Sequence, residues 1–286
     1  MSKVTVENIK DFQLDHIFDC GQCFRWNKEE DGSYTGIAGN MAVNMSLEGD
    51  KLIIDNTDEE AFEFFWKNYL DLDTDYGNIK TNLKDKDKVI GMAIKDGEGI
   101  RILNQELWET IVSFIISANN NIPRIKGCIE SLAENFGVSL GEYRGKVRYA
   151  FPSPEAMAKL TVEDLAVCKL GYRAKYLVNT SKMYLEDKDS FERLLKDDVS
   201  SAEALKMITS LNGVGPKVAN CIMLFALKKR DAFPIDVWMK KVMNYLYGFD
   251  EKDVKGMQAF AKKTFGDVAG IAQQYLFYYM RNKTID

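Results

Sequence analysis

Hydrophobic and polar positions alternate in several short runs of the N-terminal hundred residues, a pattern typical of strands that bury one face. Tyr34–Gly39, Met41–Leu47 and Lys51–Asp55 are runs of this kind, and turn-forming dipeptides that contain Gly separate them. The three runs predict an antiparallel meander. Glu59–Tyr69 is expected to be helical, and the charge run Thr81–Lys88 is expected to form a solvated surface.

From about residue 101 the apolar positions recur at intervals of three or four, which is the period of an α-helix. Within Gln105–Ser117, for example, Trp108, Ile111 and Ile115 fall on one face. The same spacing predicts helices at Arg124–Phe136, Pro154–Lys159, Val162–Cys168, Ala174–Leu185, Ser190–Lys196, Ser201–Ser210, Pro216–Leu227, Asp236–Leu246, Met257–Phe265 and Ala269–Arg281. The expected fold class is α+β, with an antiparallel β-sheet lobe and flanking helices over residues 1–100 and a helical body over residues 101–286.

The chain has one histidine and five cysteines, which restricts its metal and redox chemistry. A single histidine, His16, excludes two-histidine zinc sites, and its apolar neighbours favour a structural role. Cys20 and Cys23 form a CxxC pair, but no second pair completes a zinc site. Two ordinary cysteines that flank a Gly turn are therefore the preferred interpretation, and no metal site is expected here. The odd number and wide spacing of the cysteines indicate reduced thiols in the cytoplasm.

The net charge of −5 conceals two regions of opposite sign. Residues 1–100 carry 11 basic and 21 acidic residues, whereas residues 101–286 carry 27 basic and 22 acidic ones. Because phosphate backbones attract Lys and Arg, the second region is the better candidate for nucleic-acid contact. Its basic runs are Ala166–Met183 and Lys228–Arg230. A solvated face is the usual role of such runs, and only their proximity to the motifs described below makes them candidates. No stretch is long and apolar enough to span a bilayer, and the N-terminus lacks the apolar core of a signal peptide. No membrane partner is expected.

The string LNGVGPKVA contains the most informative motif of the chain. Gly213 and Gly215 permit the backbone angles of a tight turn around Val214, and Pro216 suits the first position of a new helix. Exposed backbone N–H groups and the positive end of that helix then form a phosphate site that needs no net basic charge. A plain helix–turn–helix corner is the alternative. The full string with its helical flanks predicts a helix–hairpin–helix DNA-backbone binder at about 205–227.

Lys217 lies in the first turn of the second hairpin helix, where the helix dipole disfavours a cation and makes the neutral amine easier to populate. A neutral amine can attack a carbon and form a Schiff base, although a surface lysine that contacts phosphate is the alternative. Asp236 follows nineteen residues later, in the loop at about 231–238, where it is a good candidate for a helix N-cap. A carboxylate near the amine can also stabilise positive charge on a sugar or carry protons.

The stretch 211–236 resembles the helix–hairpin–helix DNA glycosylases with their Gly/Pro-Asp loop. A Lys in the second hairpin helix marks those members that are also lyases. More narrowly, the chain resembles the eukaryotic-type branch of the 8-oxoguanine DNA glycosylase/AP lyase family, and a bacterial member is expected. The matching motifs are CGQCFRW at 20–26, SANNNIPRI at 117–125, GYRAKY at 171–176 and AQQYLF at 272–277.

The resemblance implies roles for residues that composition and spacing do not single out. The Gly21 carbonyl would accept a hydrogen bond from N7–H of 8-oxoguanine, and Gln273 and Phe277 would contact the edge and the face of the flipped base. Cys221 would complete this lesion pocket. The residues implied to fill the vacated stack and read the unpaired cytosine are Asn119, Arg124, Tyr172 and Arg173. For Asn119 and the two asparagines after it, a helix C-terminal cap is the alternative.

Two positions depart from the family pattern. A His commonly stands two residues after the catalytic Asp, where this chain has Trp238. A carboxylate commonly stands three residues after the stacking Phe, where this chain has Met280. In the family, these two polar residues pair and help to hold a backbone phosphate. Both are replaced here, so this phosphate contact departs from the family pattern, whereas Lys217 and Asp236 are retained. We expect Trp238 and Met280 to pack against each other.

The resemblance implies a monomeric DNA repair enzyme that binds double-stranded DNA containing a damaged base, in the nucleoid of the cytoplasm. It would excise 8-oxoguanine opposite cytosine through a Schiff base at Lys217 and nick the strand by β-elimination. No redox or organic cofactor is expected, and a cation between the hairpin carbonyls and a phosphate is compatible with the motif. The alternatives are a related glycosylase for another lesion, which Gly21, Gln273 and Phe277 disfavour, and a non-catalytic DNA-binding module, which Lys217 and Asp236 together disfavour.

Overall fold

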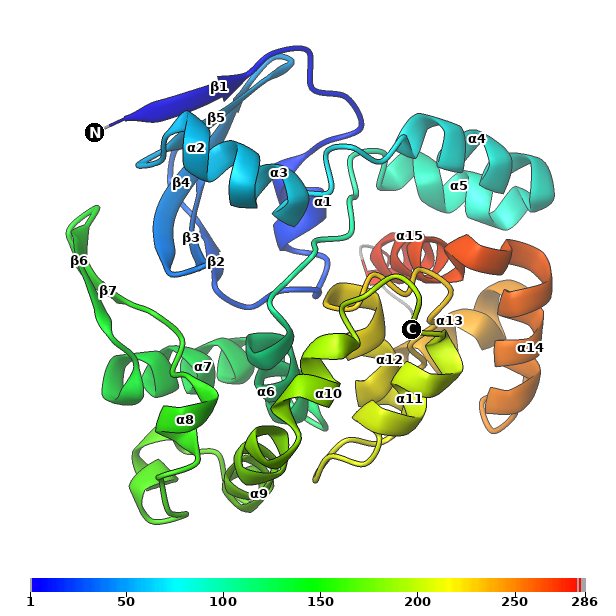
Figure 1. Cartoon of the computed structure of the whole chain (residues 1–286). Helices are drawn as coiled ribbons and strands as arrows, with labels where there is room; N and C mark the ends of the chain where they lie inside the picture. The colour runs from blue at the N-terminus through cyan, green and yellow to red at the C-terminus, as the bar shows by residue number, and fades with distance from the viewer. Residues whose placement is uncertain (1, 282, 284–286) are drawn as a thin grey trace.

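The computed structural model describes residues 2–281 and 283, which form a β lobe and a helical body (Figure 1). The β lobe is built on a five-stranded antiparallel sheet with the strand order β1-β5-β4-β3-β2. Its strands are β1 (Lys3–Val6), β2 (Trp26–Lys28), β3 (Tyr34–Ala38), β4 (Met41–Glu48) and β5 (Lys51–Asp55). The predicted meander is confirmed in β3, β4 and β5. The sequence pattern misses β1 and β2, because strands of four and three residues show too little alternation.

The helix predicted at Glu59–Tyr69 is present; it contains one π-helical segment and lies against the sheet (Figure 1). It runs from α2 (Glu59–Ala61) through η1 (Phe62–Trp66) to α3 (Lys67–Tyr69). The Trp66 side chain is fully buried in the hydrophobic core of the β lobe. There it meets Trp26 edge-on, with 6.2 Å between the ring centroids. The β lobe therefore has a core of its own.

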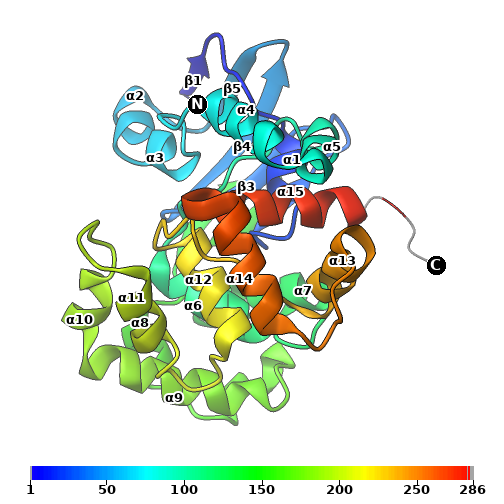
Figure 2. The same ribbon diagram turned by 90° about the vertical axis from the view of Figure 1, so that its right-hand side faces the viewer.

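Two further helices within the first hundred residues pack with the helical body. α4 (Tyr76–Lys86) contacts α5 (Lys88–Asp96), and α5 lies along α15 (Ala269–Arg281), as Figures 1 and 2 show. Ile90 of α5 is buried in the same hydrophobic core as the body helices. The predicted solvated charge run forms the largely exposed side of α4 and the start of α5. Its charged residues interrupt the apolar period, so the pattern does not reveal these helices.

The remaining elements are mostly helices, and each helix predicted beyond residue 101 has a counterpart. They are α1 (Leu14–Phe18), α6 (Leu107–Ser117), α7 (Ile122–Phe136), α8 (Pro154–Met157), the 3₁₀ turn η2 (Asp164–Cys168), α9 (Arg173–Glu186), α10 (Lys188–Arg193), α11 (Ser201–Ile208), α12 (Pro216–Phe225), α13 (Val237–Tyr247), α14 (Val254–Phe265) and the 3₁₀ turn η3 (Gly266–Val268). Across the residues that the structure describes, no helix has the length and apolar character needed to cross a membrane.

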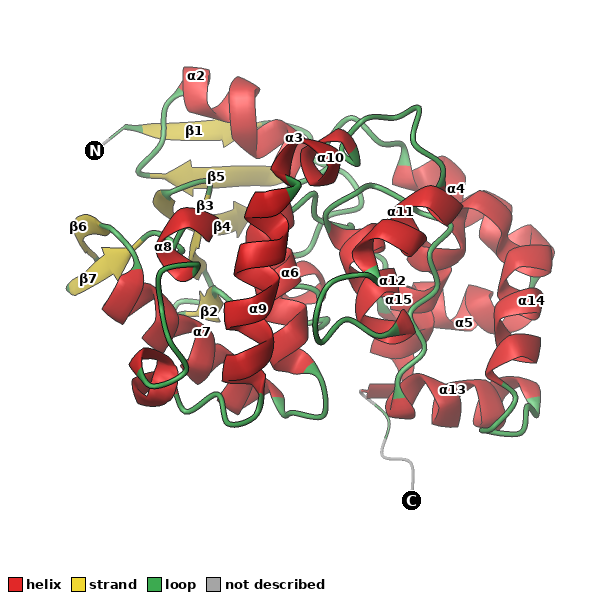
Figure 3. Cartoon of the chain, turned by 60° about the horizontal axis from the view of Figure 1, so that its bottom comes forward, coloured by secondary structure: helices red, strands yellow, loops and turns green. Residues whose placement is uncertain are grey.

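A short hairpin interrupts the helical region, and the sequence pattern does not predict it. β6 (Ser139–Tyr143) and β7 (Lys146–Tyr149) pair antiparallel, and β6 contacts β4 of the large sheet (Figure 3). The Tyr143 hydroxyl donates to the carboxylate of Asp55 at 3.3 Å. Most hairpin residues are at least partly exposed, so these strands lack the apolar alternation on which the prediction depends.

A buried charge cluster joins the β lobe to the helical body. Arg25, directly before β2, is 3% exposed and donates from Nε to Glu130 of α7 at 3.2 Å. Its Nη2 donates to the Tyr149 carbonyl of β7 at 2.6 Å, and its Nη1 lies 3.8 Å from the Glu109 carboxylate of α6. Burial raises the pKa of Glu109 to about 7, and the positive charge of Arg25 acts in the opposite direction. The cluster fixes the start of β2 against three elements of the body.

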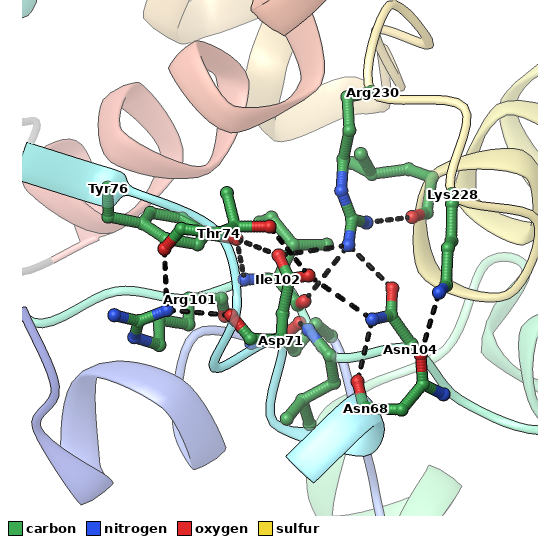
Figure 4. Close-up of polar contacts among 12 residues, drawn as sticks. Asn68, Asp71, Thr74, Tyr76, Arg101, Ile102, Asn104, Lys228 and Arg230 are labelled. Carbon is green, nitrogen blue, oxygen red and sulfur yellow. Dashed lines mark hydrogen bonds and ion pairs between the residues drawn. The ribbon is translucent and has the colours of Figure 1, made fainter. Parts of the chain in front are cut away.

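A second polar junction, which we call the Asp71 junction, holds the linker 101–104 between the two parts of the molecule (Figure 4). Arg230, which follows α12, donates to Asp71 at 3.3 Å, to the Ile102 carbonyl at 3.2 Å and to the Asn104 side chain at 2.6 Å. Asn104 in turn donates to Asp71 at 3.3 Å. The linker is therefore attached both to the segment after α3 and to the loop after α12.

Candidate active site

The predicted hairpin joins α11 to α12. Gly213 has φ +82°, and a Cβ at this position would lie 2.8 Å from the ring of Tyr176 on α9, so both the turn and the close approach require glycine. Thr180 of α9 donates to the Asn212 carbonyl at 2.7 Å and holds the turn in place. The Val214 side chain is only 7% exposed, so the hairpin does not offer it to a ligand. The expected helix, turn and second helix are all present.

The start of α12 is open to solvent. Gly215 is its N-cap, in an extended conformation, and supplies no side chain to accept from the first turn. Apart from Gly215 itself and its chain neighbours, no described residue comes within 4 Å of the position that a Gly215 Cβ would occupy. Pro216 takes the first helical position, so the N–H groups of Lys217 and Val218 have no acceptor within the helix. Together with the helix dipole, these groups favour the binding of a phosphate.

Asp236 caps α13, as predicted from its place after Pro234. Its Oδ1 accepts a hydrogen bond from the N–H of Met239 at 2.7 Å, and its backbone is extended. The residue is partly exposed. The cap fixes the orientation of the carboxylate, and thus the loop before α13 presents an acidic group in a defined direction.

A cavity of about 670 Å³ brings the two candidate catalytic residues together, because Lys217 and Asp236 both line it. Its other walls are residues 117–120 at the end of α6, the hairpin glycines and the start of α13. Lys240 and Lys241 also line the cavity. No motif in the sequence singles out these two lysines. Their position about one turn after Asp236 could have indicated that they lie near this carboxylate. The cavity thus combines one acidic group with three amines.

Lys217 lies between an aromatic ring and a buried thiol. Its Nζ is 5.5 Å from the centre of the Phe114 ring on α6. Cys221 stands one turn further along α12, which places the two side chains on the same helix face. Burial raises the pKa of the Cys221 thiol, the nearby Lys217 amine opposes this rise, and Asp236 adds to it. The amine therefore occupies a partly apolar position within electrostatic reach of both groups.

Gly21 and Phe277, two of the residues expected to read the damaged base, meet where α15 passes the loop between α1 and β2. Gly21 of this loop has φ +83°, and a Cβ there would lie 3.6 Å from Cε1 of Phe277. Gln273, one turn earlier on α15, is 4% exposed and accepts from the Gln274 side chain at 2.7 Å. The described residues that line the 670 Å³ cavity include neither these residues nor Cys221. The structure therefore brings Gly21 and Phe277 together, outside the cavity that holds Lys217.

The residues expected to face the unpaired base surround the end of α6, but they differ in exposure. Asn119 is exposed, with φ +50°, Arg124 is exposed on α7, and Tyr172 is 56% exposed. Arg173, in contrast, is 4% exposed, and its Nη2 donates to the carbonyls of Ala118 at 2.6 Å and Asn119 at 2.9 Å. In this structure Arg173 points inward and orders the loop that presents Asn119.

The capping alternative applies to the two asparagines that follow Asn119. The Asn120 side chain donates to the Ile116 carbonyl at the end of α6, at 3.1 Å. The Asn121 side chain accepts from the N–H of Arg124 at 3.0 Å and caps the start of α7. The two caps hold the turn between α6 and α7, and Asn119 projects from it with a left-handed backbone.

The side chains of the basic run after α12, Lys228 to Arg230, form hydrogen bonds within the protein. Lys228 donates to Asn68 at 2.7 Å, Lys229 donates to the Val199 carbonyl at 2.5 Å, and Arg230 belongs to the Asp71 junction. The run follows the far end of a ten-residue helix, about 15 Å from the hairpin. Lys228 and Arg230 thereby hold the two parts of the molecule together, and a contact of this run with DNA stays a prediction.

The scarce residues have structural environments, as expected. His16 accepts at Nδ1 from the N–H of Gly99 at 3.1 Å, and burial lowers its pKa. Cys20 and Cys23 are buried free thiols, and burial raises the pKa of Cys20 to about 12. Within residues 2–281 and 283, no three His, Cys, Asp or Glu side chains are grouped so that they could hold a metal ion.

The two departures from the family pattern are accommodated by apolar packing. Met280 is 1% exposed in the core of the body, and Trp238 packs against the same core, where α13 meets α15. The indole Nε1 of Trp238 is buried and finds no hydrogen-bond partner in the described part of the chain. A direct contact between the two side chains stays a prediction.

Comparisons with known proteins identify the family of the chain. Residues 4–111 match the 8-oxoguanine DNA glycosylase N-terminal domain, and residues 112–266 match the HhH-GPD superfamily of base excision DNA repair proteins. The N-glycosylase/DNA lyase OGG1 of Arabidopsis thaliana is 30% identical over 279 residues, which cover 91% of this chain and 75% of the relative. The N-glycosylase/DNA lyase of Saccharomyces cerevisiae is 30% identical over 262 residues, which cover 82% of this chain and 68% of the relative.

A solved structure from Clostridium acetobutylicum extends the similarity to the whole fold. It is an 8-oxoguanine glycosylase/lyase in complex with double-stranded DNA containing cytosine opposite 8-oxoguanine. Its TM-score to this chain is 0.94 at 43% identity, over 99% of this chain and 96% of that one. The α+β fold class, with a β lobe on a helical body, is therefore confirmed. The chain belongs to the 8-oxoguanine DNA glycosylase family, within the helix–hairpin–helix superfamily of base excision DNA repair proteins.

Proposed function

We propose that this protein excises 8-oxoguanine from double-stranded DNA, preferably opposite cytosine, and nicks the strand at the abasic site it creates. The observation that carries the proposal is the placement of Lys217 and Asp236 in one cavity, between the phosphate-binding hairpin and the loop of Asn119. The substrate is supported by relatives named N-glycosylase/DNA lyase and by the Clostridium acetobutylicum complex. The protein would act as a monomer in the cytoplasm, on DNA of the nucleoid.

The first chemical step is displacement of the base. Lys217 Nζ, as the neutral amine, attacks C1′ of the flipped deoxyribose. The Nζ–C1′ bond forms while the glycosidic bond breaks, and the electron pair of the broken bond leaves with the base, which takes up a proton. Asp236 stabilises the positive charge that develops on the sugar. Because the cap of α13 already holds this carboxylate, the step requires little reorganisation of the protein.

The second step is strand cleavage. The lone pair of Nζ opens the sugar ring, O4′ takes a proton, and a Schiff base forms between C1′ and Nζ. Loss of a proton from C2′ then breaks the C3′–O bond and releases the downstream strand with its 5′-phosphate. The N–H groups at the start of α12 hold the backbone during both steps, and Lys240 and Lys241 add positive charge beside the cavity. The hairpin carbonyls would hold a cation if one binds, and it would add positive charge near the phosphate.

Recognition of the lesion would depend on the hydrogen atom that oxidation places on N7. The Gly21 carbonyl accepts from this N7–H, whereas unmodified guanine opposes the carbonyl with a second acceptor. The Phe277 ring, which lies beside Gly21 in this structure, would stack on the base. Gln273 and Cys221 would complete the pocket. Asn119, which lines the cavity, and Arg124, which is exposed on α7, would contact the unpaired cytosine.

Excision from a set of duplexes tests this proposal. Single-turnover release of 8-oxoguanine is measured opposite each of the four bases, beside a duplex that contains a methylated adenine. We expect the fastest release of 8-oxoguanine opposite cytosine. Release of the methylated base alone would support the related glycosylase with another substrate. Binding without release of any base would support the non-catalytic DNA-binding module.

A further inference from the structure

The loop that carries Gly21 is anchored by a fully buried amide. Gln22 is 0% exposed, and its Nε2 donates to the carbonyls of Ile17 at 2.9 Å and Arg101 at 2.8 Å. Its Oε1 accepts from the N–H of Leu103 at 2.8 Å. Both polar atoms of this amide thus bond to backbone groups, which attaches the loop to the linker 101–104. A buried amide with this many partners holds its surroundings in one arrangement.

A second glutamine connects the same loop to the catalytic helix. The Gln105 side chain donates from Nε2 to the backbone carbonyl of Gln22 at 2.7 Å. The backbone N–H of Gln105 donates to the carbonyl of Phe225 at 2.8 Å. Phe225 is the last residue of α12, and Lys217 lies in the first turn of this helix. One residue therefore bonds both to the neighbour of Gly21 and to the helix that carries the nucleophile.

The linker on which Gln22 docks is itself held firmly. The Arg101 guanidinium donates to the carbonyls of Lys10 at 2.9 Å and Asp71 at 2.7 Å. The Asp71 junction holds the other end of the linker, where Arg230 and Asn104 meet (Figure 4). The connection from Gly21 to α12 therefore passes only through buried or partly buried groups that have hydrogen-bond partners.

We propose that Gln22 and Gln105 are positioning residues that fix the Gly21 carbonyl relative to Lys217 and thereby set the selectivity for 8-oxoguanine over guanine. This inference rests on the proposed function. A carbonyl that reads one N7–H must be placed within a few tenths of an ångström, because hydrogen bonds weaken steeply with poor distance and angle. A loop that lost these bonds would still fold over the same core but would no longer present its carbonyl at a fixed place.

The test compares two reactions of the same active site. Gln105→Met keeps the length of the side chain and removes its hydrogen bond to the Gln22 carbonyl. Gln22→Met removes the three hydrogen bonds of the Gln22 side-chain amide. Each variant is assayed on 8-oxoguanine opposite cytosine and on a pre-formed abasic site opposite cytosine. An abasic site has no base for Gly21 to read, but its cleavage requires the same lysine, Lys217. We expect Gln105→Met to lower base excision at least roughly tenfold while abasic-site cleavage stays within about twofold.

A matched control separates this effect from general loss of stability. Asn44→Leu removes another buried amide, which is 5% exposed and donates to Ser33 and Thr35 within the sheet. This variant should leave the ratio of the two reactions unchanged. Equal losses in both reactions for Gln105→Met, or no loss in either, would overturn the inference. If Gln22→Met does not fold, Gln105→Met decides, because that side chain makes only one of the bonds.

Binding gives a second readout, in the Lys217→Gln background where no chemistry occurs. There, Gln105→Met should lower the ratio of affinities for the 8-oxoguanine and guanine duplexes at least roughly fivefold. An unchanged ratio would overturn the inference. A wild-type protein that cleaves abasic sites but releases no 8-oxoguanine would instead refute the proposed function.

Discussion

Replacing Glu109 by Gln removes the carboxylate whose pKa burial raises from its ordinary value of 4.5 to about 7. In the wild type, the folded protein binds the proton of Glu109 more tightly than the unfolded chain does. The contribution of Glu109 to stability is therefore greatest below about pH 4.5 and decreases as the pH rises to about 7. The difference between the two pKa values corresponds to about 3 kcal/mol of unfolding free energy. Since the Glu109 side chain is 20% exposed, this value is an upper bound. We expect the wild type to lose about 1–2 kcal/mol of unfolding free energy between acidic and alkaline pH through this group.

Urea unfolding at several pH values measures this loss. Near pH 5 the wild type and Glu109→Gln should have similar free energies of unfolding, because both carry a neutral group beside Arg25. Near pH 8 the variant should be more stable by about 1–2 kcal/mol. Glu134→Gln, on the exposed side of α7, is the matched control and should show no such trend. A difference between wild type and Glu109→Gln that does not vary with pH would refute the reasoning.

Three further substitutions test individual parts of the site. Gly213→Ala strains a left-handed turn, and the added Cβ meets the Tyr176 ring. Thermal denaturation should therefore show a loss of about 1–3 kcal/mol in the free energy of unfolding, and duplex affinity should fall for all sequences. An unchanged affinity would contradict the role of the hairpin. Asp236→Asn preserves the helix cap and the melting temperature but should lower base excision at least roughly tenfold, and equal rates would refute a catalytic role. Arg124→Ala should reduce the preference for cytosine by about tenfold in excision assays against all four bases, whereas an unaltered preference would exclude Arg124 as a reader.

Long periodic segments and special backbone positions could be read from the sequence. The body helices follow from their apolar spacing, and the hairpin follows from the demands of Gly213 and Pro216. Asp236 as a helix cap also follows from local chemistry, because its bond to the N–H three residues later is a property of the sequence itself. These features depend on contacts within a few residues.

Features that depend on distant contacts could not be predicted. Most residues of β6 and β7 are at least partly exposed, and β6 contacts the large sheet from far along the chain. The inward orientation of Arg173 depends on the Ala118 and Asn119 carbonyls, about fifty residues away in the sequence. The role of Lys228–Arg230 was likewise set by partners elsewhere, since charge alone does not reveal which way a side chain points. Gly21 is recognised only through family resemblance, because a turn glycine has no chemical signature of lesion reading.

Borohydride trapping tests the central claim, that Lys217 is the nucleophile, most directly. Borohydride reduces a Schiff base to a stable amine, so the wild-type protein and a duplex with 8-oxoguanine opposite cytosine should give a covalent adduct. Mass spectrometry of the digested adduct should place the link on the peptide that contains Lys217, and Lys217→Gln should bind the duplex without forming an adduct. No adduct with the wild type, or an adduct that persists in Lys217→Gln, would contradict the account.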